Sequence, residues 1–304
     1  VPFLFALDVQ IRLLVALPLL IGAELFVHDW SRGLIRQFVD RDIIAAEDRP
    51  RFNDIIASAL RLRNSVTLEL LLIVIAIAGH WAALSLALNT STWYGAWVDG
   101  RLHFTPAGYW LALISLPLFR FILLRWYFRL FIWYRFLWQV SQLPLCLNTL
   151  HPDRAGGIGF LARSMFAFAP VLLAHTVAVA GTIGNRIWHA GALLPEFKLE
   201  IAGVLIFLLL LVLVPLTFFS VQLTYAKRKG VREYGNVASV YVRDFRDKWI
   251  EGRNPDAERL LGAGDIQSLA DLGNSFAVAQ ETRLVPFGKE QVFSLAMILV
   301  APLL

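Results

Sequence analysis

Long apolar stretches with almost no ionisable residues alternate along this chain with charged connectors. The clearest are Ile201–Val221, Ser164–Ile183 and Val66–Leu88, which hold at most two ionisable residues each. Each is as long as a helix must be to cross the hydrocarbon core of a bilayer, roughly 20 residues. Because lipid leaves every backbone polar group to be satisfied internally, such segments cross as helices. The sequence therefore predicts an all-α, polytopic transmembrane helix bundle.

Composition supports a lipid-exposed surface. Of the 304 residues, 58% are hydrophobic and the mean hydropathy is +0.61, whereas soluble domains are about half apolar. The net charge of +5 comes from basic residues beside the apolar runs, so we expect membrane lipid as a partner and no nucleic acid. Cys146 is the only cysteine, which excludes a disulfide within the chain and a thiolate metal cluster. We predict no metal site and no cofactor.

We predict about six membrane helices, the last of them incomplete. They cover residues 9–28, 66–88, 107–128, 161–183, 200–224 and the run that starts near 290. The last run, Gln291–Leu304, is shorter than a span needs, and the chain starts with Val1 rather than Met. We therefore expect the sequence to be part of a longer chain.

The distribution of arginine predicts how the helices are oriented. The connector Asn89–Pro106 has one arginine, Arg101, whereas the connector between the first two predicted helices has seven: Arg32, Arg36, Arg41, Arg49, Arg51, Arg61 and Arg63. Because cytoplasmic connectors carry the excess of Lys and Arg, we predict that the long connectors face the cytoplasm. The start of the chain then lies outside.

The connectors divide the predicted protein into three parts. Residues 1–226 form the bundle, which includes an amphipathic cytoplasmic connector at 31–64, broken near Pro50, and an exterior hairpin at 89–106. The pair Asp99 and Gly100 favours the tight turn of that β-hairpin. Residues 227–289 form a cytoplasmic helical subdomain, and residues 290–304 begin a further transmembrane helix.

Arginines within the third predicted helix are the most unusual feature of the sequence. After thirteen uncharged residues the segment contains Arg120, Arg125, Arg129 and Arg135. A buried arginine costs at least about 2.5 kcal/mol on insertion scales, so it reaches the surface, pairs or faces water. One interpretation is anchoring at an aromatic-rich interface. The other is a cytoplasmic vestibule that attracts anions, and Arg120 is its strongest candidate because it is farthest from the inner surface.

Two glutamates are predicted at the same depth as these arginines. Glu24 lies on the first predicted helix and Glu69 on the second, within reach of Arg120 or Arg125. Because charges inside a membrane usually pair, a structural ion pair is favoured over proton-coupled carboxylates of a transporter.

Two histidines lie in the predicted outward halves of their helices. His80 and His175 are far apart in the sequence, but both are expected at a depth in the outer half of the bilayer, where they could meet. A polar contact between helices is favoured over a metal pair, since no carboxylate stands at ligand spacing.

A glycine-rich turn precedes the fourth predicted helix. Its chemistry-bearing residues are His151, Asp153, Arg154, Gly156, Gly157 and Gly159. A glycine-rich turn that leads into a helix can bind phosphate, but this one lacks the Lys-Ser/Thr pair of a P-loop. A tight re-entry turn is therefore the favoured interpretation.

Three segments together resemble a family of uncharacterised bacterial multi-pass membrane proteins. They are the glycine-rich turn at 151–161, the acidic helix start at 258–276 and the segment Arg283–Phe287. The resemblance implies a bacterial inner-membrane location. It implies nothing about activity.

Three classes of function remain open. The leading hypothesis is a channel or transporter with an arginine-lined cytoplasmic vestibule that favours anions. The alternative is a membrane-anchored sensor or scaffold whose cytoplasmic helices bind a protein partner. An enzyme that uses His151 and Asp153 ranks last, because the sequence supplies no nucleophile, and no catalytic residue is assigned. Small residues in the fourth predicted helix favour a homo-oligomer.

Overall fold

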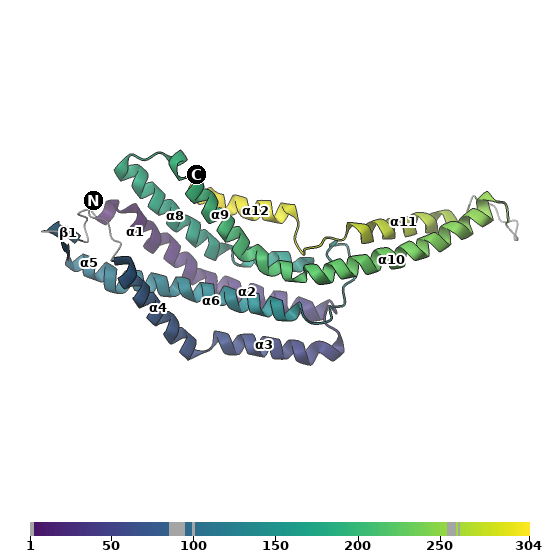
Figure 1. The fold of residues 1–304 in the computed structure, drawn as a ribbon, viewed down its shortest axis with the longest axis horizontal. Helices are drawn as coiled ribbons and strands as arrows, with labels where there is room; N and C mark the ends of the chain where they lie inside the picture. The colour runs from purple at the N-terminus through teal and green to yellow at the C-terminus, as the bar shows by residue number, and fades with distance from the viewer. Residues whose placement is uncertain (1–2, 85–94, 99–100, 254–259, 261) are drawn as a thin grey trace.

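The computed structural model describes residues 3–84, 95–98, 101–253, 260 and 262–304. The described chain is almost entirely helical, and it forms an elongated bundle from which two helices extend at one end (Figure 1). Large apolar side chains face outward from the bundle, among them Leu14, Leu25, Leu70 and Leu199. Such a surface suits lipid rather than water.

Three continuous helical runs are long and apolar enough to cross a membrane. The first, Leu7–Asp40, joins α1 (Leu7–Ile11), a π-helical turn and α2 (Leu17–Asp40). The second, Pro106–Val140, joins α5 (Pro106–Trp110), another π-helical turn and α6 (Leu116–Val140). These runs position the arginine-rich segment against the first helix.

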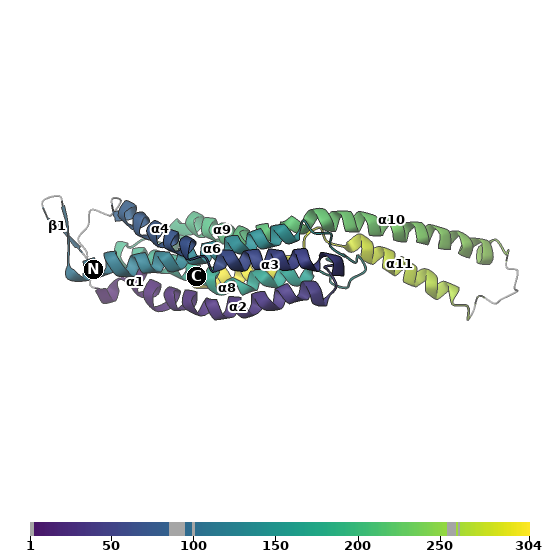
Figure 2. The same ribbon diagram turned by 90° about the horizontal axis from the view of Figure 1, so that it is seen from below.

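The third run, Leu194–Ile250, is far longer than a bilayer requires. It contains α9 (Lys198–Leu213), a 3-10 segment at Val214–Phe219 and α10 (Ser220–Phe245). A second helix, α11 (Asp265–Glu281), packs along α10, and Figures 1 and 2 show this pair extending beyond the bundle. We call α10 and α11 the helical hairpin.

Two further membrane spans are present if each of two bent helix pairs is counted as one span. The run Ala46–Arg63, which ends in α3 (Arg49–Arg63), meets α4 (Val66–Leu84) at 45°. The run Gly159–Ala167, which ends in α7 (Arg163–Ala167), meets α8 (Ala169–Ala190) at 42°. The described residues thus contain three to five candidate spans. The prediction of six membrane helices is not supported by this range. The segment predicted as the incomplete sixth forms α12 (Lys289–Val300), whose twelve residues are too few to span a membrane.

Two short strands pair between α4 and α5. Strand β1 (Gly95–Val98) runs antiparallel to β2 (Arg101–Phe104), with Ala96 opposite His103 and Trp97 opposite Leu102. The predicted turn residues Asp99 and Gly100 lie outside the described residues. The exterior position of this pair stays a prediction.

The first half of the connector at 31–64, predicted as an amphipathic segment of its own, is instead the end of a longer helix. Residues 31–40 do not form a separate helix, since α2 continues through them to Asp40. The chain then turns at Asp42, where φ is +51°, and Pro50 stands near the start of α3, where its missing N–H costs no hydrogen bond. The prediction placed the break at the proline because proline stops a helix, but here it starts one.

An aromatic cluster fixes the hairpin end of the bundle. Phe38 of α2 is fully buried and its ring lies within 6.5 Å, centroid to centroid, of four others: Phe52, Phe136, Phe160 and Phe219. These rings come from α3, α6, the 3-10 turn before α7 and the segment before α10. The bundle therefore has a packed apolar core where its charged connectors meet.

Candidate functional site

Two arginines of α6 pair with two glutamates from neighbouring helices. The guanidinium of Arg129 lies 2.5 Å from Oε1 of Glu24 on α2. That of Arg125 lies 3.7 Å from the same oxygen and 3.8 Å from Oε1 of Glu69 on α4. The side chain of Arg129 is only 17% exposed, so a carboxylate partner compensates for the loss of water. Arg125, Glu24 and Glu69 are thus brought together as an ion-pair network.

Arg120 does not join this network. It lines a separate pocket of about 340 Å³ together with Arg12, Thr182 and Glu200. Its Nη1 atom is buried and has no hydrogen-bond partner among the described residues. At about 100° per residue, the five-residue step from 120 to 125 turns the side chain about 140° around α6. Arg120 and Arg125 therefore face different neighbours.

The network borders a pocket of about 520 Å³ between α2, α3 and α6, which we call the α2–α3–α6 pocket. Three arginines and one glutamate line it: Arg63, Arg125, Arg129 and Glu24. The opposite end is apolar and aromatic, with Ile35, Ile56, Ile132, Trp133 and Phe136 among its residues. Arg63 and His28 also line the pocket, but the sequence analysis assigned neither to a site. The position of Arg63 just before the apolar helix α4 was a signal that could have found it.

The ends of this pocket are set by the parallel packing of α2 and α6. Glu24 pairs with Arg129, whereas fourteen residues later along α2 Phe38 lies beside Phe136 of α6. The buried indole Nε1 of Trp126 donates a 2.9 Å hydrogen bond to the carbonyl oxygen of Leu20 and holds the two helices together. The charged residues therefore gather at one end of the pocket and the apolar ones at the other.

The structure describes the contacts of one of the two predicted intramembrane histidines, His175. His175 on α8 bonds through Nε2 to the hydroxyl of Tyr127, at 2.9 Å, and through Nδ1 to the carbonyl oxygen of Val171, at 2.7 Å. His80 lies on α4, and its side chain falls outside the described residues. Among the residues described, no group of three His, Cys, Asp or Glu side chains is arranged to hold a metal ion.

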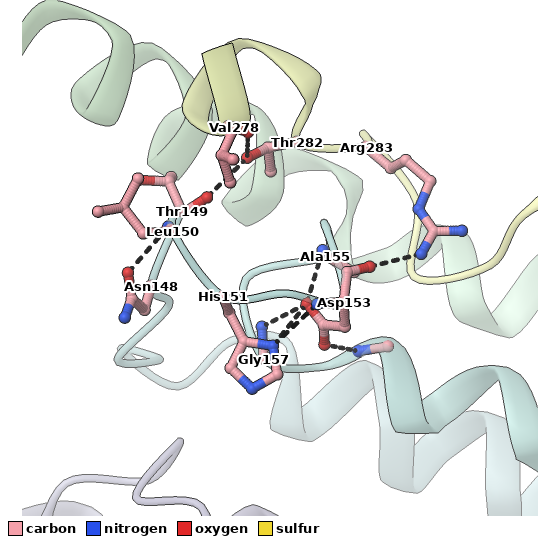
Figure 3. Close-up of polar contacts among 11 residues, drawn as sticks. Asn148, Thr149, Leu150, His151, Asp153, Ala155, Gly157, Val278, Thr282 and Arg283 are labelled. Carbon is pink, nitrogen blue, oxygen red and sulfur yellow. Dashed lines mark hydrogen bonds and ion pairs between the residues drawn. The ribbon is translucent and has the colours of Figure 1, made fainter. Parts of the chain in front are cut away.

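The glycine-rich turn is organised around the carboxylate of Asp153 (Figure 3). Its Oδ1 accepts hydrogen bonds from the N–H groups of Ala155, at 2.8 Å, and Gly157, at 3.1 Å, while Oδ2 accepts from Gly159 at 2.8 Å. His151 Nδ1 lies 2.9 Å from Oδ1 and 3.2 Å from the backbone nitrogen of Asp153. Burial raises the pKa of Asp153, but these N–H groups and His151 outweigh it, so the pKa lies below its usual range.

Glycine is required in this turn for geometric reasons. Gly156 and Gly157 have φ of +66° and +96°, where a side chain is strained. A Cβ on Gly157 would also lie 2.9 Å from Cδ1 of Ile43, and one on Gly159 would lie 2.9 Å from Oδ2 of Asp153. The N–H groups that a phosphate would use are therefore already taken by Asp153, and the geometry is that of a closed turn.

The turn is tied to the segment that follows α11. Arg283 Nη2 donates a 2.6 Å hydrogen bond to the carbonyl oxygen of Asp153, and its backbone N–H donates to that of Arg154 at 2.7 Å. Arg154 itself pairs with Glu281 at 3.1 Å. Thr282 donates to the carbonyl oxygen of Thr149 in the same contact region. The turn thus joins the helical hairpin to the bundle.

Comparison with known proteins adds no relative. No family model, no curated protein and no solved structure matches the chain. The resemblance to bacterial multi-pass membrane proteins stays a prediction.

Proposed function

We propose that the chain is an integral membrane protein that transports an organic anion, and that the α2–α3–α6 pocket is where the anion binds. The observation that carries the proposal is the division of this pocket into an arginine-rich end and an apolar end. A carboxylate, sulfonate or phosphate bound at the first end would place an attached hydrocarbon group against the second.

The charges at the first end favour an incoming anion. Arg63, Arg125 and Arg129 face one lining carboxylate, that of Glu24. Arg125 bridges Glu24 and Glu69 at 3.7 and 3.8 Å, distances that are long for a hydrogen bond. A ligand oxygen can therefore displace these contacts at small cost and gain charge-assisted hydrogen bonds.

The position of the arginines matches a membrane boundary. The apolar helix α4 begins at Val66, three residues after Arg63, so the lipid region starts near the level of this charge. We place this level at the cytoplasmic surface, because the connector that contains α3 carries the arginine excess. An anion would then enter from the cytoplasmic side, where the positive charges along residues 32–63 attract it.

A transporter fits the pockets better than an open channel does. Arg120 and Arg125, which the sequence predicted to share one vestibule, line different pockets on different sides of α6. Movement between the two faces would need a rearrangement of helices. The π-helical turns at Arg12–Ala16 and Leu111–Ser115 lie in the two runs that flank the Arg120 pocket, and such turns interrupt regular helix hydrogen bonding.

The test is uptake into proteoliposomes that contain the purified chain. Octanesulfonate, which carries a permanent negative charge, is compared with methanesulfonate, which lacks the apolar part, and with octyltrimethylammonium, which reverses the charge. We expect saturable uptake of octanesulfonate alone, reduced about tenfold or more in Arg129→Gln. Arg36→Gln, an exposed arginine on α2 outside the pocket, is the matched control. Equal uptake of all three probes, or an equal loss in both variants, would refute the proposal.

A sensor or scaffold is the second candidate. Its support is the helical hairpin, which extends beyond the bundle (Figure 2). The hairpin carries three exposed apolar side chains, Val237, Val240 and Ile266. The discriminating experiment replaces residues 231–278 with a flexible linker in the full chain. Unchanged octanesulfonate uptake together with loss of a specific protein from affinity-purified complexes would favour the scaffold, whereas loss of uptake without loss of any bound protein would count against it.

A further inference from the structure

A second pocket, separate from the α2–α3–α6 pocket, lies where the helical hairpin meets the bundle. Its volume is about 790 Å³, and we call it the junction pocket. Its walls come from the end of α2, the turn at 152–154, the start of α7 and the segment 281–291, which leads into α12. Segments far apart in the sequence thus enclose one space.

Basic side chains dominate the walls of the junction pocket. Five are basic, namely Arg41, Arg154, Arg163, Arg283 and Lys289, and three are acidic, namely Asp153, Glu281 and Glu290. The difference is a net charge of +2. Two of the acids are already engaged, since Glu281 pairs with Arg154 and both carboxylate oxygens of Asp153 accept backbone N–H groups.

Three of the basic groups have no carboxylate partner in the described part of the chain. Arg163 is the first residue of α7 and Lys289 the first of α12, and no ion pair involves either. Arg41 lies against an aromatic face, with its guanidinium carbon 5.2 Å from the ring centroid of Phe160. Their charges are therefore available to a ligand.

Arg283 provides a fixed guanidinium in the same wall. Its Nη2 is held by the carbonyl oxygen of Asp153, while its Nε is buried and has no partner among the described residues. Gly288 permits this position, because a Cβ there would lie 2.5 Å from Nη1 of Arg283. A fixed arginine loses little freedom when an anion binds, which raises affinity.

We propose that the junction pocket binds a phosphate group, held by Arg163, Lys289 and Arg283. A phosphate offers several acceptor oxygens and up to two negative charges, which matches a set of guanidinium and ammonium donors better than a carboxylate does. The pocket is far larger than a lone phosphate, so the group is part of a phospholipid headgroup or of a soluble phosphate compound. This proposal does not depend on anion transport through the α2–α3–α6 pocket.

The experiment measures thermal stabilisation of the full chain in nanodiscs. One arm adds inorganic phosphate or pyrophosphate to discs of phosphatidylcholine alone, and the other replaces part of that lipid with phosphatidic acid. The test variant is Arg163→Gln/Lys289→Gln. The control is Arg32→Gln/Arg36→Gln, which removes two charges from exposed sites on α2 that line neither pocket.

We expect stabilisation in at least one arm, with the apparent affinity lowered roughly tenfold per substituted side chain in the test variant and unchanged in the control. Stabilisation by soluble phosphates identifies a soluble ligand, and stabilisation by phosphatidic acid alone identifies a headgroup. No stabilisation in either arm, or the same loss in both double variants, overturns the proposal. If the double variant does not fold, Arg163→Gln and Lys289→Gln are measured singly, since both side chains are exposed. Octanesulfonate uptake reports on the other pocket and is measured separately.

Discussion

Nη2 of Arg129 and Oε1 of Glu24 lie 2.5 Å apart, and this pair closes the charged end of the α2–α3–α6 pocket. The Arg129 side chain is 17% exposed and that of Glu24 is 47% exposed. The pair is therefore intermediate between a surface ion pair, which contributes little to stability, and a buried one, whose disruption is costly.

Removing the Glu24 charge is expected to lower stability. Among the described residues, Glu24→Gln removes one of the two carboxylate partners of Arg125 and the single one of Arg129. The free energy of unfolding should therefore fall by about 1–2 kcal/mol. Thermal unfolding in detergent micelles measures the effect. The control is Glu47→Gln, at an exposed site that forms no ion pair with any residue the structure describes. The expectation is contradicted if both substitutions shift the midpoint equally.

The sequence predicts that arginines and glutamates pair inside the bundle, but it does not predict which arginine pairs with Glu24 and Glu69. The depth of Arg120, Arg125, Glu24 and Glu69 within apolar segments indicated that opposite charges would meet. Which arginine met them depended on rotation around α6, where residues 120 and 125 face different sides. A hydropathy pattern gives depth along a helix, and it does not give the neighbour that each face contacts.

The lengths of the helices show a similar limit. Apolar runs located α4 and α9 well, because the absence of charge follows directly from lipid. They gave no sign that α2 continues to Asp40 or that one run reaches Ile250, because a helix outside lipid needs only an amphipathic face. The junction pocket also escaped prediction, since Arg41, Arg163 and Lys289 are more than 100 residues apart along the chain.

Asp153 is expected to make stability depend on pH in the acidic range. Its pKa is lower in the folded chain than the usual value near 3.9, so it adds stability above that value and the contribution is lost as the pH falls through the folded pKa. At pH 7, Asp153→Asn should lower the free energy of unfolding by about 2 kcal/mol, and with it the unfolding midpoint. Between pH 5 and pH 3, the stability of Asp153→Asn should fall less than that of the unsubstituted chain.

Asp153→Asn and the unsubstituted chain are compared by thermal unfolding at each pH in the same micelles. Asp54→Asn serves as the control, because Asp54 is an exposed carboxylate on α3 with no ion pair in the described part of the chain. An identical loss of stability in acid for Asp153→Asn and the unsubstituted chain would show that the turn does not rely on an ionised Asp153.

Gly157→Ala separates two reasons for glycine in the turn. The position has φ of +96°, and the added Cβ would lie 2.9 Å from Cδ1 of the buried Ile43. Gly191 has φ of +67° with nothing within 4 Å of an added Cβ. Strain alone costs about 1–2 kcal/mol, so Gly191→Ala should lose that amount and Gly157→Ala measurably more. Chemical denaturation decides, and equal losses would mean that Ile43 moves aside freely.

Asp265 is expected to hold the far part of the helical hairpin together. Asp265 is the first residue of α11, after the N-cap Gly264. Its carboxylate accepts hydrogen bonds from Lys248 Nζ at 3.0 Å and Trp249 Nε1 at 2.9 Å, both from the end of the α10 run. The Lys248 and Trp249 hydrogen bonds lower the pKa of Asp265, so the contacts persist at neutral pH.

Asp265→Asn should therefore loosen the hairpin locally. Hydrogen exchange should become faster in residues 241–250 and 265–270, while the bundle helices α2, α6 and α8 keep their protection. Asp271→Asn is the matched control, because Asp271 accepts its side-chain hydrogen bond from Gln267 on the same helix. Faster exchange throughout the bundle would show instead that the hairpin and the bundle unfold as one cooperative unit, coupled through the hydrogen bond from Arg283 to Asp153.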